Sequence, residues 1–159
     1  MMRSLLLLRH GEAEPAHSGL EDAQRALTER GRLEAIEAAE LIQRSRVRLD
    51  LLLASPAARA AQTAHIIAAH LDLPQAPLFA EHLYLASSEG LLSTLQRCPE
   101  RVQSLLLIGH NPGVSELARQ LCGDGAAFTL CTCGLCQLDF GNRWEELGLE
   151  RVVSFALLR

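Results

Sequence analysis

Residues 4–11 read Ser4-Leu5-Leu6-Leu7-Leu8-Arg9-His10-Gly11, a short apolar run that ends in two basic side chains and a glycine. A continuous apolar run of this length, bounded by polar and turn residues, is typical of a strand buried on both faces of a parallel sheet. Three more segments share this character: Leu51–Ala54, Ser104–Ile108 and Val152–Leu157. A fifth strand is predicted at the border of the sheet, at Leu135–Phe140, and a short sixth strand at Leu78–Ala80.

Helical patterns lie between these strands. Thr28 is a good N-cap for an amphipathic helix that continues to about Arg46. Ser55 and Pro56 predict a second helix start, with serine as the N-cap and proline in the first helical position, and this helix extends to about Leu71. Two further helices are predicted, at Ser88–Arg97 and Val114–Leu121. Strands that alternate with helices predict a three-layer α/β/α sandwich with a mostly parallel central sheet, formed by residues 1–159 as a single domain.

The charge balance limits the partners that the chain can bind. The 159 residues include 15 basic side chains, all of them arginines, against 19 acidic ones, for a formal net charge of −4. An acidic chain without a basic run is unsuited to nucleic acid and to anionic lipid surfaces. No stretch approaches the roughly 20 apolar residues of a membrane span. The apolar run near Met1 is too short for a signal peptide, so we expect a cytoplasmic protein with no membrane partner.

Three of the five cysteines, Cys131, Cys133 and Cys136, lie close together in the sequence. A structural zinc site requires four ligands, usually as two separated pairs, and Cys98 and Cys122 lie in predicted helices without a partner nearby. Alternation along a strand predicts that Cys131 and Cys133 share one face as small core residues. A metal or redox role for the cluster is the alternative to this structural interpretation.

Basic side chains follow the predicted strands at the points where the strands end. Arg9 and His10 end the first strand, His110 follows Ser104–Ile108, and Arg59 lies near the start of the helix after Leu51–Ala54. In α/β sheets, ligands bind beyond the carboxyl ends of the strands, so we expect these four side chains to converge. Guanidinium forks, imidazole rings and a helix N-terminus all suit a tetrahedral oxyanion. The sequence therefore predicts a site for a phosphoryl group.

These motifs, taken in order, resemble the histidine phosphatase superfamily and its phosphoglycerate mutase-like fold. The resemblance covers nearly the whole chain and rests on four motifs: Arg9-His10-Gly11, Leu27-Thr28 with Gly31, Ser55-Pro56 with Arg59 and Gln62-Thr63-Ala64, and Gly109-His110-Asn111-Pro112-Gly113. The short chain, the last of these motifs, and a predicted strand at Thr132–Leu138 followed by Trp144 are most similar to the SixA-like phosphohistidine phosphatase branch.

The resemblance implies a role for each residue of the site. His10 is expected to be the nucleophile, phosphorylated and then hydrolysed, while Arg9, Arg59 and His110 hold the phosphoryl oxygens. No cofactor and no metal is expected. Glu81 is the expected proton donor for the leaving group, with other carboxylates as competitors: Glu12, Glu14 and Glu89.

Three functions remain open at this point. The expected one is removal of phosphate from a phosphohistidine-containing protein, with inorganic phosphate as the product, because this short chain has no evident insertion to cover the site. The first alternative is a phosphatase for a small phosphoester. The second, from another class, is a catalytically silent module that binds phosphate or a phosphoprotein.

Overall fold

The computed structural model describes residues 1–123, 125–149 and 152–159. Within these residues, six strands form one sheet in the order β3-β2-β4-β1-β5-β6. Their bounds are β1 (Arg3–Arg9), β2 (Leu51–Ala54), β3 (Leu78–Phe79), β4 (Ser104–Gly109), β5 (Leu135–Phe140) and β6 (Ser154–Leu157). Strands β1 to β4 are parallel, whereas β5 is antiparallel to β1 and β6 is antiparallel to β5. The prediction of a mostly parallel sheet is confirmed.

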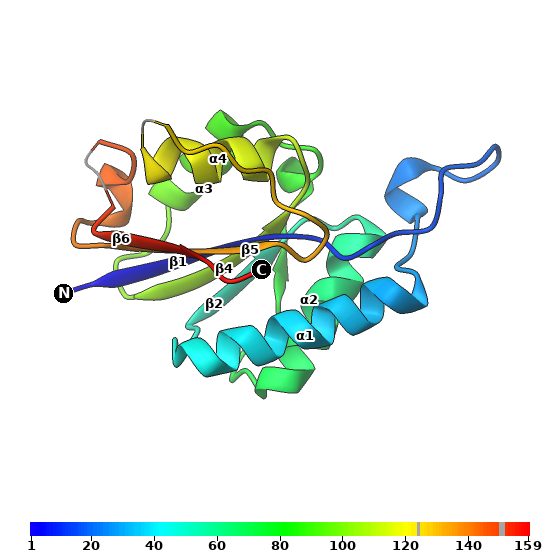
Figure 1. Cartoon of the computed structure of the whole chain (residues 1–159), viewed down its shortest axis with the longest axis horizontal. Coiled ribbons are helices and arrows are strands. Elements are labelled where there is room, and N and C mark those ends of the chain that lie inside the picture. Colours follow the sequence, from blue (N-terminus) through cyan, green and yellow to red (C-terminus); the bar gives the residue numbers. More distant parts are fainter. Residues whose placement is uncertain (124, 150–151) are drawn as a thin grey trace.

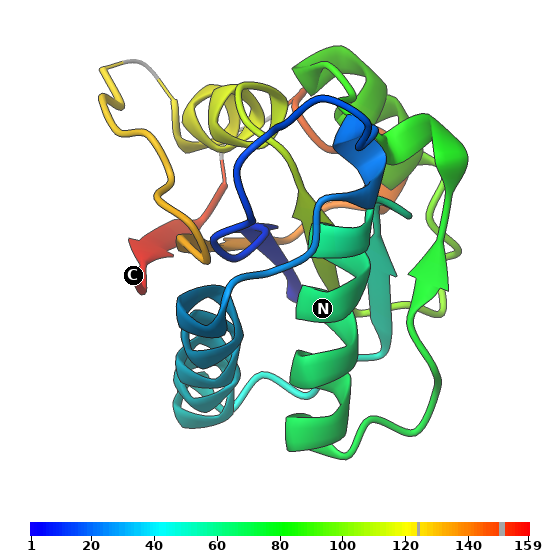
Figure 2. The same cartoon turned by 90° about the vertical axis from the view of Figure 1, so that its right-hand side faces the viewer.

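In the described parts of the chain, four α-helices cover the two faces of this sheet. Figure 1 shows α1 and α2 below the sheet and α3 and α4 above it, which confirms the three-layer sandwich. Figure 2 looks onto the carboxyl edge of the parallel strands, where the segment between β1 and α1 arches over the sheet. The helices are α1 (Glu29–Ser45), α2 (Ala58–Leu71), α3 (Ser88–Gln96) and α4 (Gly113–Cys122), with short 3-10 turns η1 (Asp22–Gln24), η2 (Glu81–Leu83) and η3 (Trp144–Glu146).

The leucine run of β1 supplies both cores of the sandwich. Leu5 and Leu7 pack on the α3 and α4 side, whereas Leu6 and Leu8 pack on the α1 and α2 side. All four side chains are completely buried. This two-sided burial explains why the run is continuously apolar instead of alternating, because β1 lies in the interior of the sheet with a helical layer on each face.

The predicted cap of α1 is confirmed, whereas the predicted cap of α2 is wrong. The Thr28 hydroxyl accepts a hydrogen bond from the Gly31 amide at 3.0 Å. Helix α2 begins only at Ala58 and has Ala57 as its N-cap. Ser55 continues the direction of β2, since its amide donates to a carbonyl of β4, and its hydroxyl faces the carboxyl edge of the sheet.

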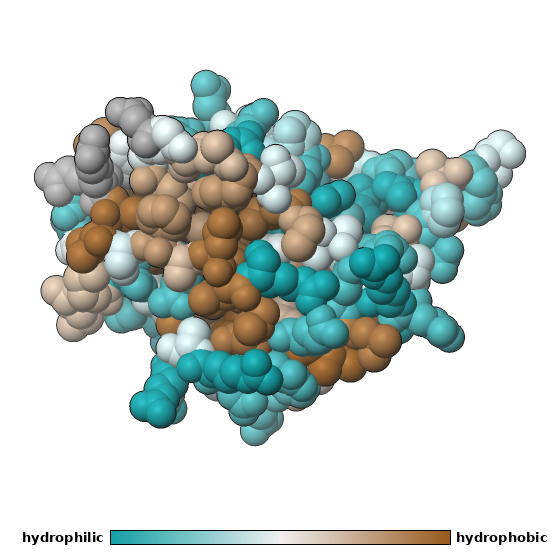
Figure 3. Space-filling model, viewed as in Figure 1, coloured by the Kyte–Doolittle hydropathy of each residue, from teal (hydrophilic) through white to brown (hydrophobic). Residues whose placement is uncertain are grey.

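The predicted burial of the last strand is also wrong. Strand β6 is an antiparallel edge strand beyond β5, and all four of its residues are exposed. Phe155 is 49% exposed and Leu157 is 46% exposed. Figure 3 shows an apolar band on the face of the molecule that carries β6. An apolar run alone does not distinguish an interior strand from an edge strand, because that difference depends on which neighbours the strand acquires.

The cysteines do not alternate as predicted. Cys131 is exposed and Cys133 is buried, because both precede β5 in a loop where Cys133 adopts a φ of 51°. Cys122, at the end of α4, does have a neighbouring cysteine, since it packs against the buried cluster that contains Cys136. Burial raises the pKa of Cys136 to about 12, so this thiol is a weak nucleophile. In the described part of the chain, no group of His, Cys, Asp and Glu side chains is arranged to hold a metal ion, and no helix is long and apolar enough to cross a membrane.

Candidate active site

A cavity of about 420 Å³ opens at the carboxyl edge of the sheet, beside the ends of β1 and β4. The predicted residues Arg9, His10, Arg59 and His110 all line it. Strands β1 and β4 are parallel neighbours, so the residues that follow them emerge side by side. Glu12, one of the predicted competitors for the role of proton donor, lines it as well. The remaining lining residues were not assigned to the site from the sequence: Ala13, Asp22, Arg25, Leu85, Asn111 and Thr132.

His10 is held in a single tautomer by contacts at both ring nitrogens. Its Nδ1 lies 2.7 Å from the Gly11 carbonyl oxygen, and because a carbonyl can only accept, Nδ1 carries the proton. Arg59 Nε donates to His10 Nε2 across 3.3 Å, and because a guanidinium can only donate, Nε2 carries a lone pair. A neutral imidazole with a free electron pair on Nε2 is the form that can attack phosphorus.

The backbone around His10 is fixed from three directions. The His10 amide donates to the Gly109 carbonyl of β4 at 3.1 Å, and the His10 carbonyl accepts from the Cys133 amide at 3.1 Å. The Gly11 amide donates to the Thr63 hydroxyl of α2 at 3.1 Å. These bonds join the end of β1 to β4, to α2 and to the loop before β5, so the backbone that carries the imidazole is held in one position.

Glycines allow the loop after β1 to lie directly against the first turn of α1. A Cβ atom at Gly31 would lie 2.1 Å from the Glu12 carbonyl oxygen, and one at Gly11 would lie 2.7 Å from the Gly31 carbonyl oxygen. The Thr28 amide also donates to the Glu12 carbonyl, at 2.9 Å. Both positions therefore require glycine, because any side chain would collide with the neighbouring backbone.

Arg9 and His110 approach the cavity from neighbouring strands. Arg9 Nη1 donates to the Leu130 carbonyl oxygen at 3.3 Å, which ties its guanidinium to the loop before β5. His110 lies with its ring centroid 5.1 Å from that of His10. Its Nε2 is 2.7 Å from the hydroxyl oxygen of Ser55, the residue that the sequence assigned to a helix cap.

Burial keeps both imidazoles neutral. It lowers the pKa of His10 to about 4, against the opposing effect of the bond to Gly11, and the charges of Arg59 and Arg9 act in the same direction as burial. Burial also lowers the pKa of His110 to about 3, with smaller contributions from His10 and Arg59. At pH 7 the cavity thus contains two uncharged rings between guanidinium groups, which suits a dianionic phosphoryl group.

Comparison with known proteins identifies the family. The model of the histidine phosphatase superfamily (branch 1) matches residues 5–82. The phosphohistidine phosphatase SixA of Escherichia coli is 32% identical over 120 residues, which are 74% of this chain and 73% of that protein. This chain belongs to the histidine phosphatase superfamily.

Further comparisons show that the similarity to known proteins covers nearly the whole length of this histidine phosphatase. A solved structure of the protein histidine phosphatase SixA complexed with tungstate has a TM-score of 0.81 at 25% identity, covering 98% of this chain and 97% of that one. A Mycobacterium tuberculosis protein is 30% identical over 152 residues, 89% of this chain and 94% of that protein. The predicted family and fold class are confirmed, and membership indicates a phosphatase.

Arg59 of this histidine phosphatase is oriented by an aspartate that the sequence did not reveal. Its Nη1 donates to the Asp22 carbonyl at 2.8 Å and its Nη2 to Asp22 Oδ2 at 3.0 Å. The Tyr84 hydroxyl also donates to Asp22 Oδ2. These bonds, that of Tyr84 first, hold the pKa of Asp22 far below its usual range, so Asp22 is an anion that fixes Arg59 and not a proton donor.

Glu81 is not brought together with the other predicted residues. Strand β3 contains only two residues, and the chain then enters η2, where Glu81 is exposed and does not line the cavity. Residues farther along this segment do reach the site, since Leu85 lines the cavity and the Tyr84 ring lies edge-on to His110 at 5.6 Å. Of the other predicted carboxylates, only Glu12 is among the lining residues of the described chain.

The residues that sequence reasoning missed share a cause. Asp22 begins the short turn η1, Arg25 follows that turn, and Thr132 lies in the loop before β5. No periodicity or strand end marks these positions in the sequence. Tyr84 is the single tyrosine of the chain, and its position three residues after Glu81, the predicted proton donor, was the one available signal. Loop positions follow from tertiary contacts, so patterns of local sequence do not predict them.

Proposed function

We propose that this protein is a phosphohistidine phosphatase that removes phosphate from a phosphorylated protein through a covalent intermediate on His10. The observation that carries the proposal is the neutral His10 ring, whose Nδ1 proton is bound by the Gly11 carbonyl and whose unprotonated Nε2 faces Arg59. The likeness to SixA proteins of known structure and sequence supports the substrate class. Such an activity belongs to phosphohistidine-based signal transduction.

The proposed reaction has two displacements. His10 Nε2 donates its electron pair to phosphorus as the bond from phosphorus to the substrate nitrogen breaks, and the departing imidazole leaves neutral if its other nitrogen is protonated. Water then attacks the phosphorylated His10, which releases inorganic phosphate and restores the free imidazole. Arg9, Arg59 and His110 would stabilise the charge on the equatorial oxygens in both steps. No step requires a metal ion, so we expect full activity in the presence of a chelator.

The carboxylates of the site favour a leaving group that needs little help from an acid. Asp22 is held as an anion by Tyr84 and Arg59, and Glu12 Oε1 accepts from the Thr28 hydroxyl at 2.9 Å. Glu81, the donor proposed from the sequence, would have to reach the cavity by a movement of η2. An imidazole, with a reference pKa near 6.5, can depart without such a donor, whereas an alkoxide cannot.

Substrate preference tests the proposal directly. We expect kcat/KM for a phosphohistidine protein to exceed that for an alkyl phosphate such as glycerol phosphate by at least about 100-fold, since an alkoxide, unlike an imidazole, does not depart readily without an acid. We also expect Glu81→Gln to leave the rate with the phosphohistidine protein unchanged. Faster turnover of the ester, or a large loss in Glu81→Gln, would instead indicate a phosphomonoesterase that uses Glu81.

The acid limb of the pH profile tests the electrostatics of the site. His10 must be neutral to attack, and its pKa in the folded protein lies near 4, well below the ordinary 6.5. We therefore expect kcat/KM, corrected for ionisation of the substrate, to stay level from pH 7 down to about 5 and to fall by half near pH 4. A midpoint near 6.5 would contradict the neutral, buried state of the ring.

A further inference from the structure

Glu34 is a buried carboxylate beside the site that the proposed mechanism does not use. It lies on α1 and is 3% exposed, and within the described chain it is the only buried acidic residue. Burial of a carboxylate costs several kcal/mol unless hydrogen bonds and charges compensate it. The residues beside Glu34 on the buried face of α1 are small and apolar, namely Ala35, Ala38 and Ala39. Packing of this helix against the core therefore does not by itself require an acidic residue at position 34.

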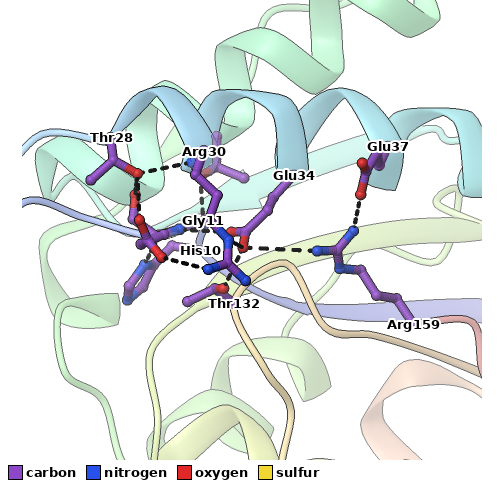
Figure 4. A network of polar contacts seen from close by, with 11 residues as sticks. His10, Gly11, Thr28, Arg30, Glu34, Glu37, Thr132 and Arg159 are labelled. Atoms are coloured by element: carbon purple, nitrogen blue, oxygen red, sulfur yellow. Dashed lines mark hydrogen bonds and ion pairs between the residues drawn. The ribbon is translucent and has the colours of Figure 1, made fainter.

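The two oxygens of Glu34 connect separate loops that line the cavity. Oε2 accepts from the Glu12 amide at 2.9 Å, in the loop after β1. Oε1 accepts from the Thr132 hydroxyl at 2.9 Å, in the loop before β5. Arg30 and Arg159 supply positive charge at 3.4 and 3.8 Å from Oε1. Figure 4 shows the carboxylate between these groups, with His10 and Gly11 close by.

The bond to Glu12 connects Glu34 to the nucleophile through one peptide unit. The Gly11 carbonyl and the Glu12 amide belong to the same planar peptide group. The carbonyl accepts from His10 Nδ1 at 2.7 Å, while the amide donates to Glu34 at 2.9 Å. A peptide that donates to a carboxylate becomes a stronger acceptor at its oxygen, because hydrogen bonds in a chain polarise one another.

We infer that Glu34 is a positioning residue for His10: through the Gly11–Glu12 peptide it keeps the proton on Nδ1 and the lone pair on Nε2. The carboxylate orients the peptide plane and makes its carbonyl oxygen a stronger hydrogen-bond acceptor. In a serine hydrolase triad an aspartate holds the tautomer and orientation of the histidine by direct contact, whereas here the effect passes through a peptide group. This inference rests on the proposed nucleophilic role of His10, but the state of the free ring can be measured without any turnover.

Glu37 provides a matched control one turn later on the same helix. It also forms an ion pair with Arg159, but its side chain is 60% exposed, and neither Glu12 nor Thr132 is among its partners. Glu37→Gln therefore removes a carboxylate and an Arg159 pair without touching the loop after β1. Glu34→Gln keeps the shape of the side chain and one acceptor oxygen but removes the charge, and Glu34→Ala removes both.

The decisive measurement is the nitrogen-15 spectrum of His10 in the full-length protein at pH 7. The wild type and Glu37→Gln should show a protonated Nδ1 and an unprotonated Nε2. In Glu34→Ala we expect both signals to move toward each other, as the second tautomer becomes populated, and in Glu34→Gln to a smaller extent. With phosphoramidate as the donor, we expect phosphorylation of His10 to slow by about 10- to 100-fold in Glu34→Ala, the loss that is typical when a residue that orients a functional histidine is removed. The loss should be smaller in Glu34→Gln.

The outcomes separate this inference from the proposed function. Unchanged His10 signals in folded Glu34→Gln and Glu34→Ala would overturn the inference, as would an equal shift in Glu37→Gln. If Glu34→Ala does not fold, as circular dichroism would reveal, the isosteric Glu34→Gln decides alone. If the wild type accepts no phosphate from phosphoramidate or a phosphohistidine protein, the proposed function fails, while the spectra still decide the role of Glu34.

Discussion

His10→Asn should abolish the covalent phosphate and lower phosphatase activity by at least about 10³-fold. Asparagine approximates the position of Nδ1 but offers no basic nitrogen at the place of Nε2, so the electron pair that attacks phosphorus is lost. The measurement is the amount of phosphate bound to the protein after brief mixing with a labelled phosphorylated donor, compared after treatment with acid and after treatment with alkali. A phosphohistidine survives alkali and is lost in acid.

His70→Asn is the matched control for this substitution. His70 is exposed in the last turn of α2 and does not line the cavity. We expect it to retain the label and the full rate. Persistent label in His10→Asn would move the nucleophile to another residue, and the complete absence of label in the wild type with tight binding of inorganic phosphate would favour the silent binding module.

Arg59→Ala should produce the second largest loss, about 10²- to 10³-fold in kcat/KM. The residue is 2% exposed, and its guanidinium is fixed by Asp22 while its Nε contacts His10, so it meets a phosphoryl group with little reorganisation. Its removal would also leave the anionic Asp22 close to the incoming phosphate. Steady-state kinetics with a phosphohistidine protein would measure the loss.

Arg59→Lys distinguishes fork geometry from charge. A lysine ammonium keeps the charge but cannot contact His10, the Asp22 carbonyl oxygen and Asp22 Oδ2 at once as the planar guanidinium does. We therefore expect it to restore less than about a tenth of the lost rate. Arg44→Ala, which removes an exposed arginine of α1, should have no effect. Full activity in Arg59→Lys would show that the site requires only a positive charge there.

Most of the layer structure could be predicted because it depends on local patterns. The run Leu5–Leu8 was predicted as part of a buried strand and Thr28 as a helix cap, and the structure agrees with both predictions. The convergence of Arg9 and His110 could also be predicted, because strands that run in parallel end at one edge. The burial of the segment that became β6 could not, because an edge strand and an interior strand can be equally apolar.

Prediction failed where a side chain has two possible partners. Ser55 has the sequence signature of a helix cap, but its hydroxyl lies against His110, a residue 55 positions away. Asp22 begins the short turn η1 and belongs to no motif, yet it fixes Arg59. Glu81 follows a strand as expected of a site residue, but the strand is too short to bring it to the cavity. In each case the choice depends on contacts between distant segments, which no local pattern encodes.

The sequence separations of these contacts have a consequence for folding. Arg9 and Leu130 are 121 positions apart, His110 and Ser55 are 55 apart, and His10 and Arg59 are 49 apart. Contacts of such high order form late, after most of the loop-closure entropy has been lost. We therefore expect a partly folded chain to lack the assembled site, and in the unfolded chain an unburied His10 would regain its ordinary basicity. Catalysis and the cooperative native state should appear and disappear together.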